Sequence, residues 1–387
     1  MRIGFDLRPA LKTNSRRRGI GRYTSSLFGA LRLANQHFEF VAYTLGSQAC
    51  SVDLSGCELR RLFYLKYPSR LNWLFEPYLF QRAMQKDRLD LFHATDVTAI
   101  PRSERGPVLA TVHDLIPWVF WEETVKSVPK DFTYALKLAR KRIASADWLL
   151  TSSKYSKQDI ADRLGFPPDR IEVTYLGCSS RILSQDESIA REKLRELYQL
   201  EGPFLFYVGG SDFRKNLPFL IRVFSRAREE GYPGKLVLAG ETFCWDVPEI
   251  RGLKRLISKC GVESSVVFPG YVEDDVLSSF YSSCDFFVFP SLYEGFGIPV
   301  AEALKCGAPL LLSDRTSIPE VAGDCAFYFN PENENDFLAV LREALESGEK
   351  VQEFRVRGME RAARFTWERT AADVLALYQK IGDRKVN

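Results

Sequence analysis

The chain has 387 residues, of which 45% are hydrophobic and 27% charged, and its formal net charge is +3. This length predicts two or three domains of ordinary size, each with its own core. The sequence has no stretch of eighteen apolar residues, and Met1 is followed at once by the strand-like RIGFDL. We therefore expect a cytoplasmic protein without a membrane span or a signal peptide.

Charge is distributed unevenly along the chain. Residues 1–185 hold 28 Lys and Arg against 18 Asp and Glu, which favours an anionic partner there, a membrane surface or a phosphate-bearing acceptor rather than nucleic acid. A solvated charged surface explains the same imbalance and stays open. Eight cysteines without C-x-x-C spacing and only three histidines predict reduced, mostly buried thiols and no metal site.

The first predicted elements are a strand over 2–7 and an amphipathic helix over 19–34. Gly19 and Gly21 open this helix, but the full G-x-G-x-x-G spacing is absent, so the dinucleotide fingerprint is weak. Strands over 39–45 and 58–65 precede a basic and aromatic stretch, YLKYPSRLNW, and a helix over 71–86. That region fits either a membrane interface or, as is commoner, a packed core.

A polar pair, His113 and Asp114, follows the predicted strand over 107–112, the next after one over 90–94. Site residues of parallel α/β sheets lie at the carboxyl ends of strands, although a lone histidine is more often structural. A helix over 131–146, a strand over 147–153, a serine-capped helix over 154–164 and a strand over 170–176 complete the first domain. Residues 177–201 are predicted to be a linker with one charged helix.

The second domain opens with a strand over 203–208 and the turn GGSDFRKN. Gly209 and Gly210 free the backbone there, and Arg214 and Lys215 place two cations at a helix start. Cations and N–H groups can stabilise a departing diphosphate. A basic cap on an exposed helix end explains the same residues. A strand over 235–239, a helix over 249–260 and the segment VVFPGYVED from Val266 follow.

The stretch from Asp285 to Asp314 carries the strongest pattern. A buried strand over 285–289 leads into a glycine turn and a helix started by Pro299, and a helix start preceded by glycines suits an anion. Glu294 in the turn and Glu302 in the helix can both face the strand's carboxyl end, where carboxylates accept hydrogen bonds from sugar hydroxyls. The pattern predicts a nucleotide-sugar site. A strand over 326–329 and helices over 334–346, 351–364 and 366–381, the last capped by Thr366, end the chain.

EGFGIPVAEA, with its two glutamates spaced E-x7-E, the FRKN turn and the HD pair together resemble the retaining glycosyltransferases of family four. The resemblance covers nearly the whole chain. It implies an α/β fold of two Rossmann-like domains facing across a cleft, the GT-B architecture, with parallel sheets flanked by helices. The domains would span 1–180 and 181–365, with a C-terminal helix of about 366–387 folded back onto the first.

The resemblance also implies roles for the site residues. Lys215 and Arg214 would hold the diphosphate, Glu294 the donor-sugar hydroxyls and Glu302 the ribose. His113 would touch the donor sugar near its reacting carbon, with Asp114 orienting it or contacting sugar or acceptor. Many relatives have an arginine where this chain has Gly210, a missing contact for which Arg214 would compensate. Further donor-binding candidates are Gly19, Gly21, Gly209, Gly210, Phe268, Gly270, Tyr271, Gly295, Phe296, Gly297 and Ile298.

The implied activity is retaining transfer of a hexose from a nucleotide sugar to a saccharide or lipid-linked oligosaccharide, with no metal or other cofactor. The motifs are most similar to those of bacterial mannosyltransferases that build surface polysaccharides, so the expected donor is GDP-mannose, and UDP-sugars stay open. The expected location is the cytoplasm, with attachment at the inner face of the cytoplasmic membrane as an alternative. A phosphorylase, a sugar-nucleotide epimerase and a non-catalytic nucleotide-sugar-binding scaffold are the rival interpretations.

Overall fold

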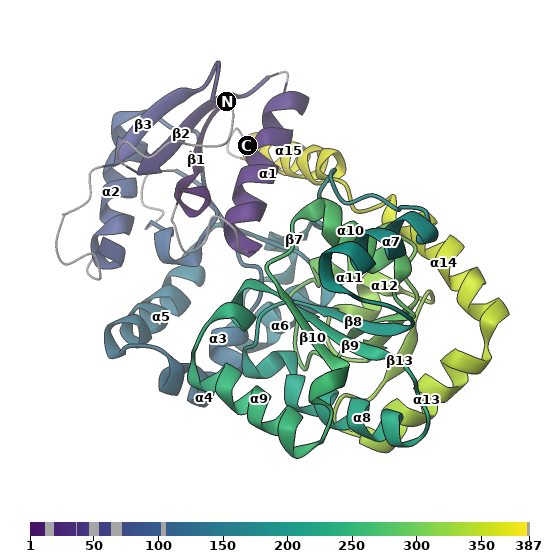
Figure 1. Ribbon diagram of the computed structural model, residues 1–387. Coiled ribbons are helices and arrows are strands. Elements are labelled where there is room, and N and C mark those ends of the chain that lie inside the picture. The colour runs from purple at the N-terminus through teal and green to yellow at the C-terminus, as the bar shows by residue number, and fades with distance from the viewer. Residues whose placement is uncertain (12–18, 36, 46–53, 63–71, 102–105, 385–387) are drawn as a thin grey trace. The chain divides into compact units, whose positions relative to one another are not determined.

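The computed structural model describes residues 1–11, 19–35, 37–45, 54–62, 72–101 and 106–384 (Figure 1). The chain divides into two compact units. Unit 1 contains Met1–Gly177 and Thr366–Asn387, and unit 2 contains Cys178–Phe365. The basic run Arg16 to Arg18 and most of the YLKYPSRLNW stretch lie outside the described residues.

Unit 1 is built on a sheet whose strands pair in parallel, in the order β3-β2-β1-β4-β5-β6-β7. All residues of β4, β5 and β6 are buried, as expected for short apolar strands covered on both faces. The strands are β1 (Arg2–Asp6), β2 (Glu39–Leu45), β3 (Glu58–Leu62), β4 (Leu91–Ala94), β5 (Val108–Thr111), β6 (Trp148–Thr151) and β7 (Ile171–Val173).

Two helices of unit 1, α6 and α15, begin at a side-chain cap. The predicted serine cap of α6 is confirmed, because Ser153 Oγ accepts a hydrogen bond from the Ser156 N–H at 3.0 Å. The helices are α1 (Gly19–Ala34), α2 (Asn72–Lys86), α3 (Ile116–Val119), α4 (Trp121–Ser127), α5 (Lys130–Ile143), α6 (Lys154–Leu164) and α15 (Trp367–Asp383).

The last helix, α15, belongs to the core of unit 1. It packs against α1, beside which it lies in Figure 1. Its Tyr378 hydroxyl is 2.6 Å from His93 Nδ1 on β4, and its Thr370 hydroxyl donates to the Tyr175 carbonyl at 2.8 Å. Thr366 caps it by accepting from the Arg369 N–H, as predicted.

Unit 2 is built on a parallel sheet in the order β10-β9-β8-β11-β12-β13. This is the Rossmann order, in which the direction of winding reverses between the first and fourth strands, here β8 and β11. The loops that follow these two strands are therefore neighbours. The strands are β8 (Phe204–Val208), β9 (Lys235–Ala239), β10 (Val266–Gly270), β11 (Phe286–Phe289), β12 (Leu310–Ser313) and β13 (Phe327–Phe329).

The charged helix predicted within the linker over 177–201 is confirmed, but it belongs to unit 2. Residues 187–198 form α7, which packs against α10 and buries Ala190 and Leu194 at i, i+4 spacing. This segment is part of the unit rather than a free connection. The helices are α7 (Glu187–Tyr198), α8 (Leu217–Glu229), α9 (Pro248–Lys259), α10 (Asp274–Ser283), α11 (Ile298–Lys305), α12 (Ile318–Ala322), α13 (Glu334–Glu346) and α14 (Gly348–Ala362).

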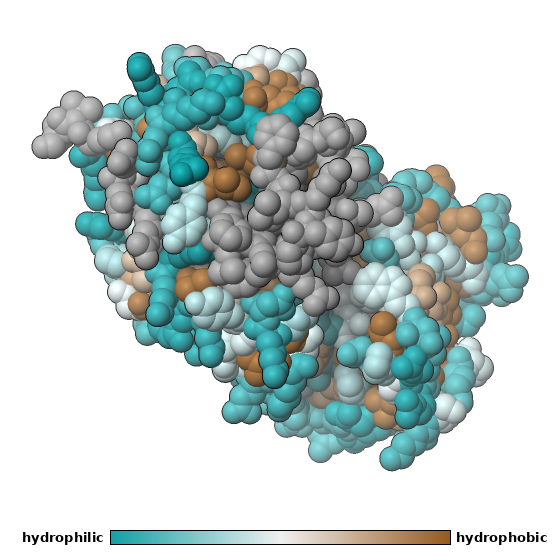
Figure 2. All heavy atoms as spheres, turned by 90° about the vertical axis from the view of Figure 1, so that its left-hand side faces the viewer, coloured by the Kyte–Doolittle hydropathy of each residue, from teal (hydrophilic) through white to brown (hydrophobic). Residues whose placement is uncertain are grey.

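The face of the molecule in Figure 2 carries both hydrophilic and hydrophobic side chains. On the face shown in Figure 2, hydrophobic residues form small separate groups with hydrophilic ones between them. Among the helices of the described residues, none combines the length and the hydropathy that a membrane crossing requires. Buried thiols lie inside unit 2, where burial raises the pKa of Cys306 to about 12.

Candidate active site

Two loops of unit 2 meet at the carboxyl ends of β8 and β11. The first contains Gly209, Gly210 and a 3-10 turn over Phe213–Lys215, and the second runs from Pro290 to Gly297. The Leu292 N–H donates to the Arg214 carbonyl at 2.7 Å, which ties the two loops together. The structure thus brings the two motifs of unit 2 to the position where Rossmann sheets bind ligands.

Glu294 is the centre of an ion cluster in these loops. Its Oε1 is 2.5 Å from Lys215 Nζ, and its Oε2 is 2.9 Å from Arg214 Nη1. Lys215 and Glu294 are each only 7% exposed, and the lysine also lies 4.9 Å from the centre of the Phe289 ring. Arg214 additionally pairs with the half-exposed Asp212 at 2.9 Å, a partner that sequence reasoning did not identify.

The charges of this cluster are coupled. Burial alone would raise the pKa of Glu294, but Lys215 and Arg214 outweigh it and lower the pKa to about 2. Burial lowers the pKa of Lys215, and Glu294 opposes this effect. Glu294 is therefore a carboxylate at neutral pH, and two cations lie within hydrogen-bond distance of it.

The turn that carries Glu294 is held by a glycine and by two hydroxyl side chains from a later segment. Gly297 has φ of 97°, a left-handed conformation that favours glycine, and it caps α11. The Thr316 hydroxyl accepts from the Glu294 N–H at 3.0 Å, and Ser317 Oγ donates to the Glu294 carbonyl at 2.9 Å. Thr316 and Ser317 lie more than twenty residues after Glu294 in the sequence, so the motif around Glu294 did not predict these contacts.

The remaining residues of the motif have a more interior position. Glu302 is 3% exposed in α11, and its Oε2 accepts from the Tyr281 hydroxyl of α10 at 3.3 Å. The Phe296 side chain is buried, with its ring 5.5 Å from Phe365. Gly295 lies in the turn and Ile298 begins α11. The motif therefore places Glu294, rather than Glu302, in direct contact with the two cations.

The predicted base-binding segment lies at the ends of the next strands. Phe268 is half-buried on β10, with its ring 5.6 Å from that of Phe243, and Tyr271 is 44% exposed. Gly270 accepts from the Gly240 N–H at 2.8 Å, so the loops after β9 and β10 are joined through their backbones. A Cβ added at Gly270 would lie 2.7 Å from Cys244 Sγ, which explains the glycine there.

His113 occupies the end of β5 in unit 1. Its backbone carbonyl accepts from Ser152 and Ser156, and its ring packs edge-on against Tyr23 at 4.4 Å. The ring Nε2 is buried and has no hydrogen-bond partner among the described residues. Burial lowers the pKa of His113 to about 4, so the imidazole is neutral at pH 7.

The other predicted residues of unit 1 lie at or just before the starts of α1 and α3. Asp114 accepts from the Ile116 N–H at 3.0 Å and so steadies the start of α3. Gly19 and Gly21 lie in the first turn of α1, which also carries Tyr23. The Tyr23 hydroxyl is 3.1 Å from Thr111 Oγ1, so α1 is anchored to β5 beside His113. Tyr23 gave no signal in the sequence beyond a helix period.

Two family models match this chain, one in each half. Residues 17–180 match Glycosyltransferase Family 4, and residues 190–361 match Glycosyl transferases group 1. The chain belongs to these glycosyltransferases. The resemblance of the EGFGIPVAEA, FRKN and HD motifs to that family is thereby confirmed.

Curated relatives support the same family. This glycosyltransferase is 29% identical over 327 residues to the O-antigen chain mannosyltransferase B of Escherichia coli, with 82% of this chain and 79% of that protein covered. It is 31% identical over 264 residues to the serotype-specific mannosyltransferase WbdA of Escherichia coli, covering 67% of this chain. The chain spans about a third of the length of the latter protein, 32%.

Solved structures support the fold. The glycosyltransferase superposes on Anabaena HepE, crystallised with UDP and glucose, with a TM-score of 0.74 and 17% identity over 98% of this chain and all of the other. At this identity the likeness shows the fold alone. The predicted α/β class, with two Rossmann-like domains of parallel strands flanked by helices and the GT-B fold, is confirmed.

Proposed function

We propose that this glycosyltransferase moves mannose from GDP-mannose to a saccharide or lipid-linked saccharide acceptor in the synthesis of a cell-surface polysaccharide, with retention at the anomeric carbon. The observation that carries the proposal is the cluster of Lys215, Arg214 and Glu294 at the reversal point of the sheet in unit 2. Support for the sugar comes from the two Escherichia coli relatives, both named as mannosyltransferases.

The chemistry assigned to the cluster is stabilisation of a leaving group. As the bond between the anomeric carbon and the phosphate oxygen breaks, negative charge grows on the diphosphate, and Lys215 and Arg214 neutralise it. The acceptor oxygen forms the new bond on the face that the diphosphate leaves, and its proton passes to a phosphate oxygen. Glu294, already ionised, accepts hydrogen bonds from donor hydroxyls, and Glu302 is assigned to the ribose.

His113 is assigned a hydrogen bond rather than proton transfer. Its neutral ring and unpartnered Nε2 suit contact with a ligand hydroxyl. The proposal requires no metal, because the side-chain cations supply the positive charge that a metal would otherwise bring to the diphosphate.

A panel of nucleotide sugars tests the donor. We expect release of GDP from GDP-mannose in the presence of an acceptor to exceed release of any other nucleoside diphosphate from its nucleotide sugar. A preference for UDP-sugars would replace the donor assignment while leaving the transfer reaction intact, and HepE with its bound UDP and glucose gives that alternative its support. Binding of donors without turnover on any saccharide acceptor would favour the non-catalytic scaffold.

A further inference from the structure

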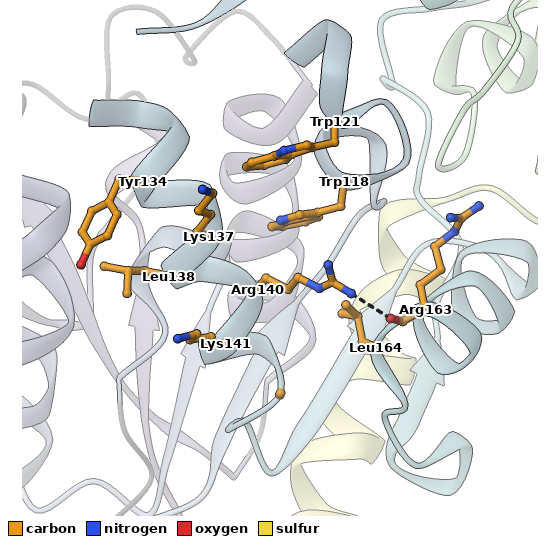
Figure 3. A pocket seen from close by; sticks show the side chains of 10 residues that line it. Trp118, Trp121, Tyr134, Lys137, Leu138, Arg140, Lys141, Arg163 and Leu164 are labelled. Atoms are coloured by element: carbon orange, nitrogen blue, oxygen red, sulfur yellow. Dashed lines mark hydrogen bonds between the residues drawn. The ribbon is translucent and has the colours of Figure 1, made fainter. Parts of the chain in front are cut away.

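A groove of about 840 Å³ lies on unit 1, outside the residues assigned to transfer (Figure 3). Its size lies within the range of small-molecule pockets. It is formed mainly by α3, α4, α5 and the end of α6. The lining residues are Trp118, Trp121, Tyr134, Lys137, Leu138, Arg140, Lys141, Ala144, Arg163 and Leu164.

The aromatic wall of the groove comes from the short helices after His113. Figure 3 shows the indoles of Trp118 and Trp121 directed toward α5. The Trp118 Nε1–H donates to the Leu136 carbonyl at 3.3 Å, which fixes this ring, and Lys137 Nζ lies 5.8 Å from the Trp121 ring centre. Tyr134 is 54% exposed beside them. The groove therefore offers flat apolar surface next to positive charge.

The charges of the groove are all positive. Lys137, Arg140 and Lys141 form no ion pair with any described residue, and only Arg163 has a carboxylate partner, Asp159. Arg140 Nη2 donates to the Arg163 carbonyl at 3.2 Å. Glu122 and Glu123 of α4 do not line the groove. The lining is thus complementary to an anion.

The types of residue that line the groove indicate which of two anionic ligands, a lipid phosphate or a phosphorylated saccharide, fits it better. No Asp, Glu, Asn or Gln occurs among the described residues that line the groove, although carboxylates and amides are the side chains that read sugar hydroxyls. Aromatic rings beside lysines are instead typical of protein surfaces that contact the headgroup layer of a membrane. The lining favours a lipid phosphate over a phosphorylated saccharide.

We propose that this groove binds the headgroup of an anionic membrane lipid, with its phosphate over Lys137 and Lys141 and its hydrocarbon against Trp118 and Trp121. The site differs from the stretch over 64–86, for which the sequence left membrane contact open. It goes beyond the transfer reaction and does not depend on the donor, so failure of the GDP-release assay would leave it standing.

Sedimentation of the full chain with vesicles tests the groove. Wild-type protein should bind vesicles containing phosphatidylglycerol, bind neutral phosphatidylcholine vesicles weakly, and lose affinity as salt rises. Each lysine near an anionic membrane contributes about a fivefold factor, so Lys137→Gln with Lys141→Gln should bind about thirtyfold more weakly. Trp121→Ala should weaken the binding that remains at high salt.

A charge-matched control separates the groove from the general charge of the protein. Lys254→Gln with Lys259→Gln removes two exposed lysines from α9 of unit 2 and should bind as wild type does. Equal loss in both double variants, or none in either, would overturn the proposal. Full displacement by glycerol phosphate, at a concentration where sodium chloride of the same ionic strength displaces little, would also overturn it, because the groove would then bind a soluble phosphate. Circular dichroism of each variant checks folding.

Discussion

The candidate residues of unit 2 and unit 1 differ in how they satisfy their polar groups. Glu294 is ionised and fully engaged with Lys215 and Arg214, whereas His113 is neutral and holds a buried nitrogen without a described partner. A ligand that binds the cations of unit 2 must compete with the Glu294 carboxylate. A ligand that binds the His113 nitrogen displaces no described hydrogen-bond partner. The first arrangement couples site to stability, and the second leaves them largely independent.

Removal of Glu294 should have the largest effect. Glu294→Ala leaves Lys215 buried without its partner, so the free energy of unfolding of unit 2 should fall by about 3–5 kcal/mol. Transfer should fall at least about a hundredfold. Denaturant unfolding and initial rates measure both, with the exposed Glu249→Ala as control. A variant as stable as that control would show that the cluster does not couple site to stability.

Acid should destabilise the two units over different pH ranges. The pKa of His113 lies near 4, below its usual 6.5, so the stability that its neutral form contributes is complete above pH 6.5 and is lost as pH falls toward 4. The pKa of Glu294 lies near 2 instead of 4.5, so its contribution is lost only between pH 4.5 and 2. Protonation of either group inside the folded unit costs roughly 3 kcal/mol, a penalty that appears only in acid and leaves the comparison at neutral pH unchanged.

Unfolding measured across this pH range checks the order. His113→Asn should flatten the dependence between pH 6.5 and 4, and Glu294→Gln the dependence below pH 4.5. His93, buried on β4, has its pKa lowered mainly by burial and secondarily by His113, so it keeps most of its own contribution to the slope of unit 1 in His113→Asn. Identical pH profiles for the two variants would contradict the assignment.

His113→Ala should change activity more than stability. We expect kcat/KM to fall about a hundredfold, while loss of the edge contact with Tyr23 costs about 1 kcal/mol of unfolding free energy. Tyr23→Phe is the matched control, because it keeps the ring contact and removes only the hydroxyl bound to Thr111. Unchanged rates in His113→Ala would remove this residue from the site.

Asp212→Asn should have the smallest effect, and it should strengthen ligand binding rather than weaken it. Asp212 is half-exposed and competes for Arg214, so its neutralisation should tighten GDP binding about twofold to fivefold, the range of a surface ion pair. Titration calorimetry would detect this change. Weaker binding would indicate that Asp212 positions Arg214 rather than restraining it.

Local patterns predicted much of the fold. The bounds of α6 and β9 match the predicted ones, because a serine cap and a run of buried apolar residues mark them in the sequence. Two short helices, α3 and α4, were missed, since four and seven residues are too few to reveal a helical period. The serine-rich α10 was missed as well. Its Ser279 is buried and donates to Gln185 at 2.7 Å, so polar residues occupy core positions there.

The candidate site was predictable in its residue types and less so in its contacts. Glycines after a strand, followed by cations or carboxylates, identified the two loops of unit 2. Lys215 and Glu294 are 79 residues apart, and their contact depends on β8 and β11 being neighbours in the sheet. Strand order follows from the packing of the whole unit. The aromatic and cationic groove had no motif, because its residues come from separate helices.

The helix α15 has a consequence for how the protein is made. It is synthesised only after residues 178–365, yet the side chains it supplies complete the interior of unit 1, most of which is synthesised before those residues. The early domain must wait, with part of its apolar surface uncovered, until the whole of the later domain has been synthesised. Truncation after residue 365 would therefore destabilise unit 1 rather than unit 2, and nascent chains would depend on chaperones during that interval.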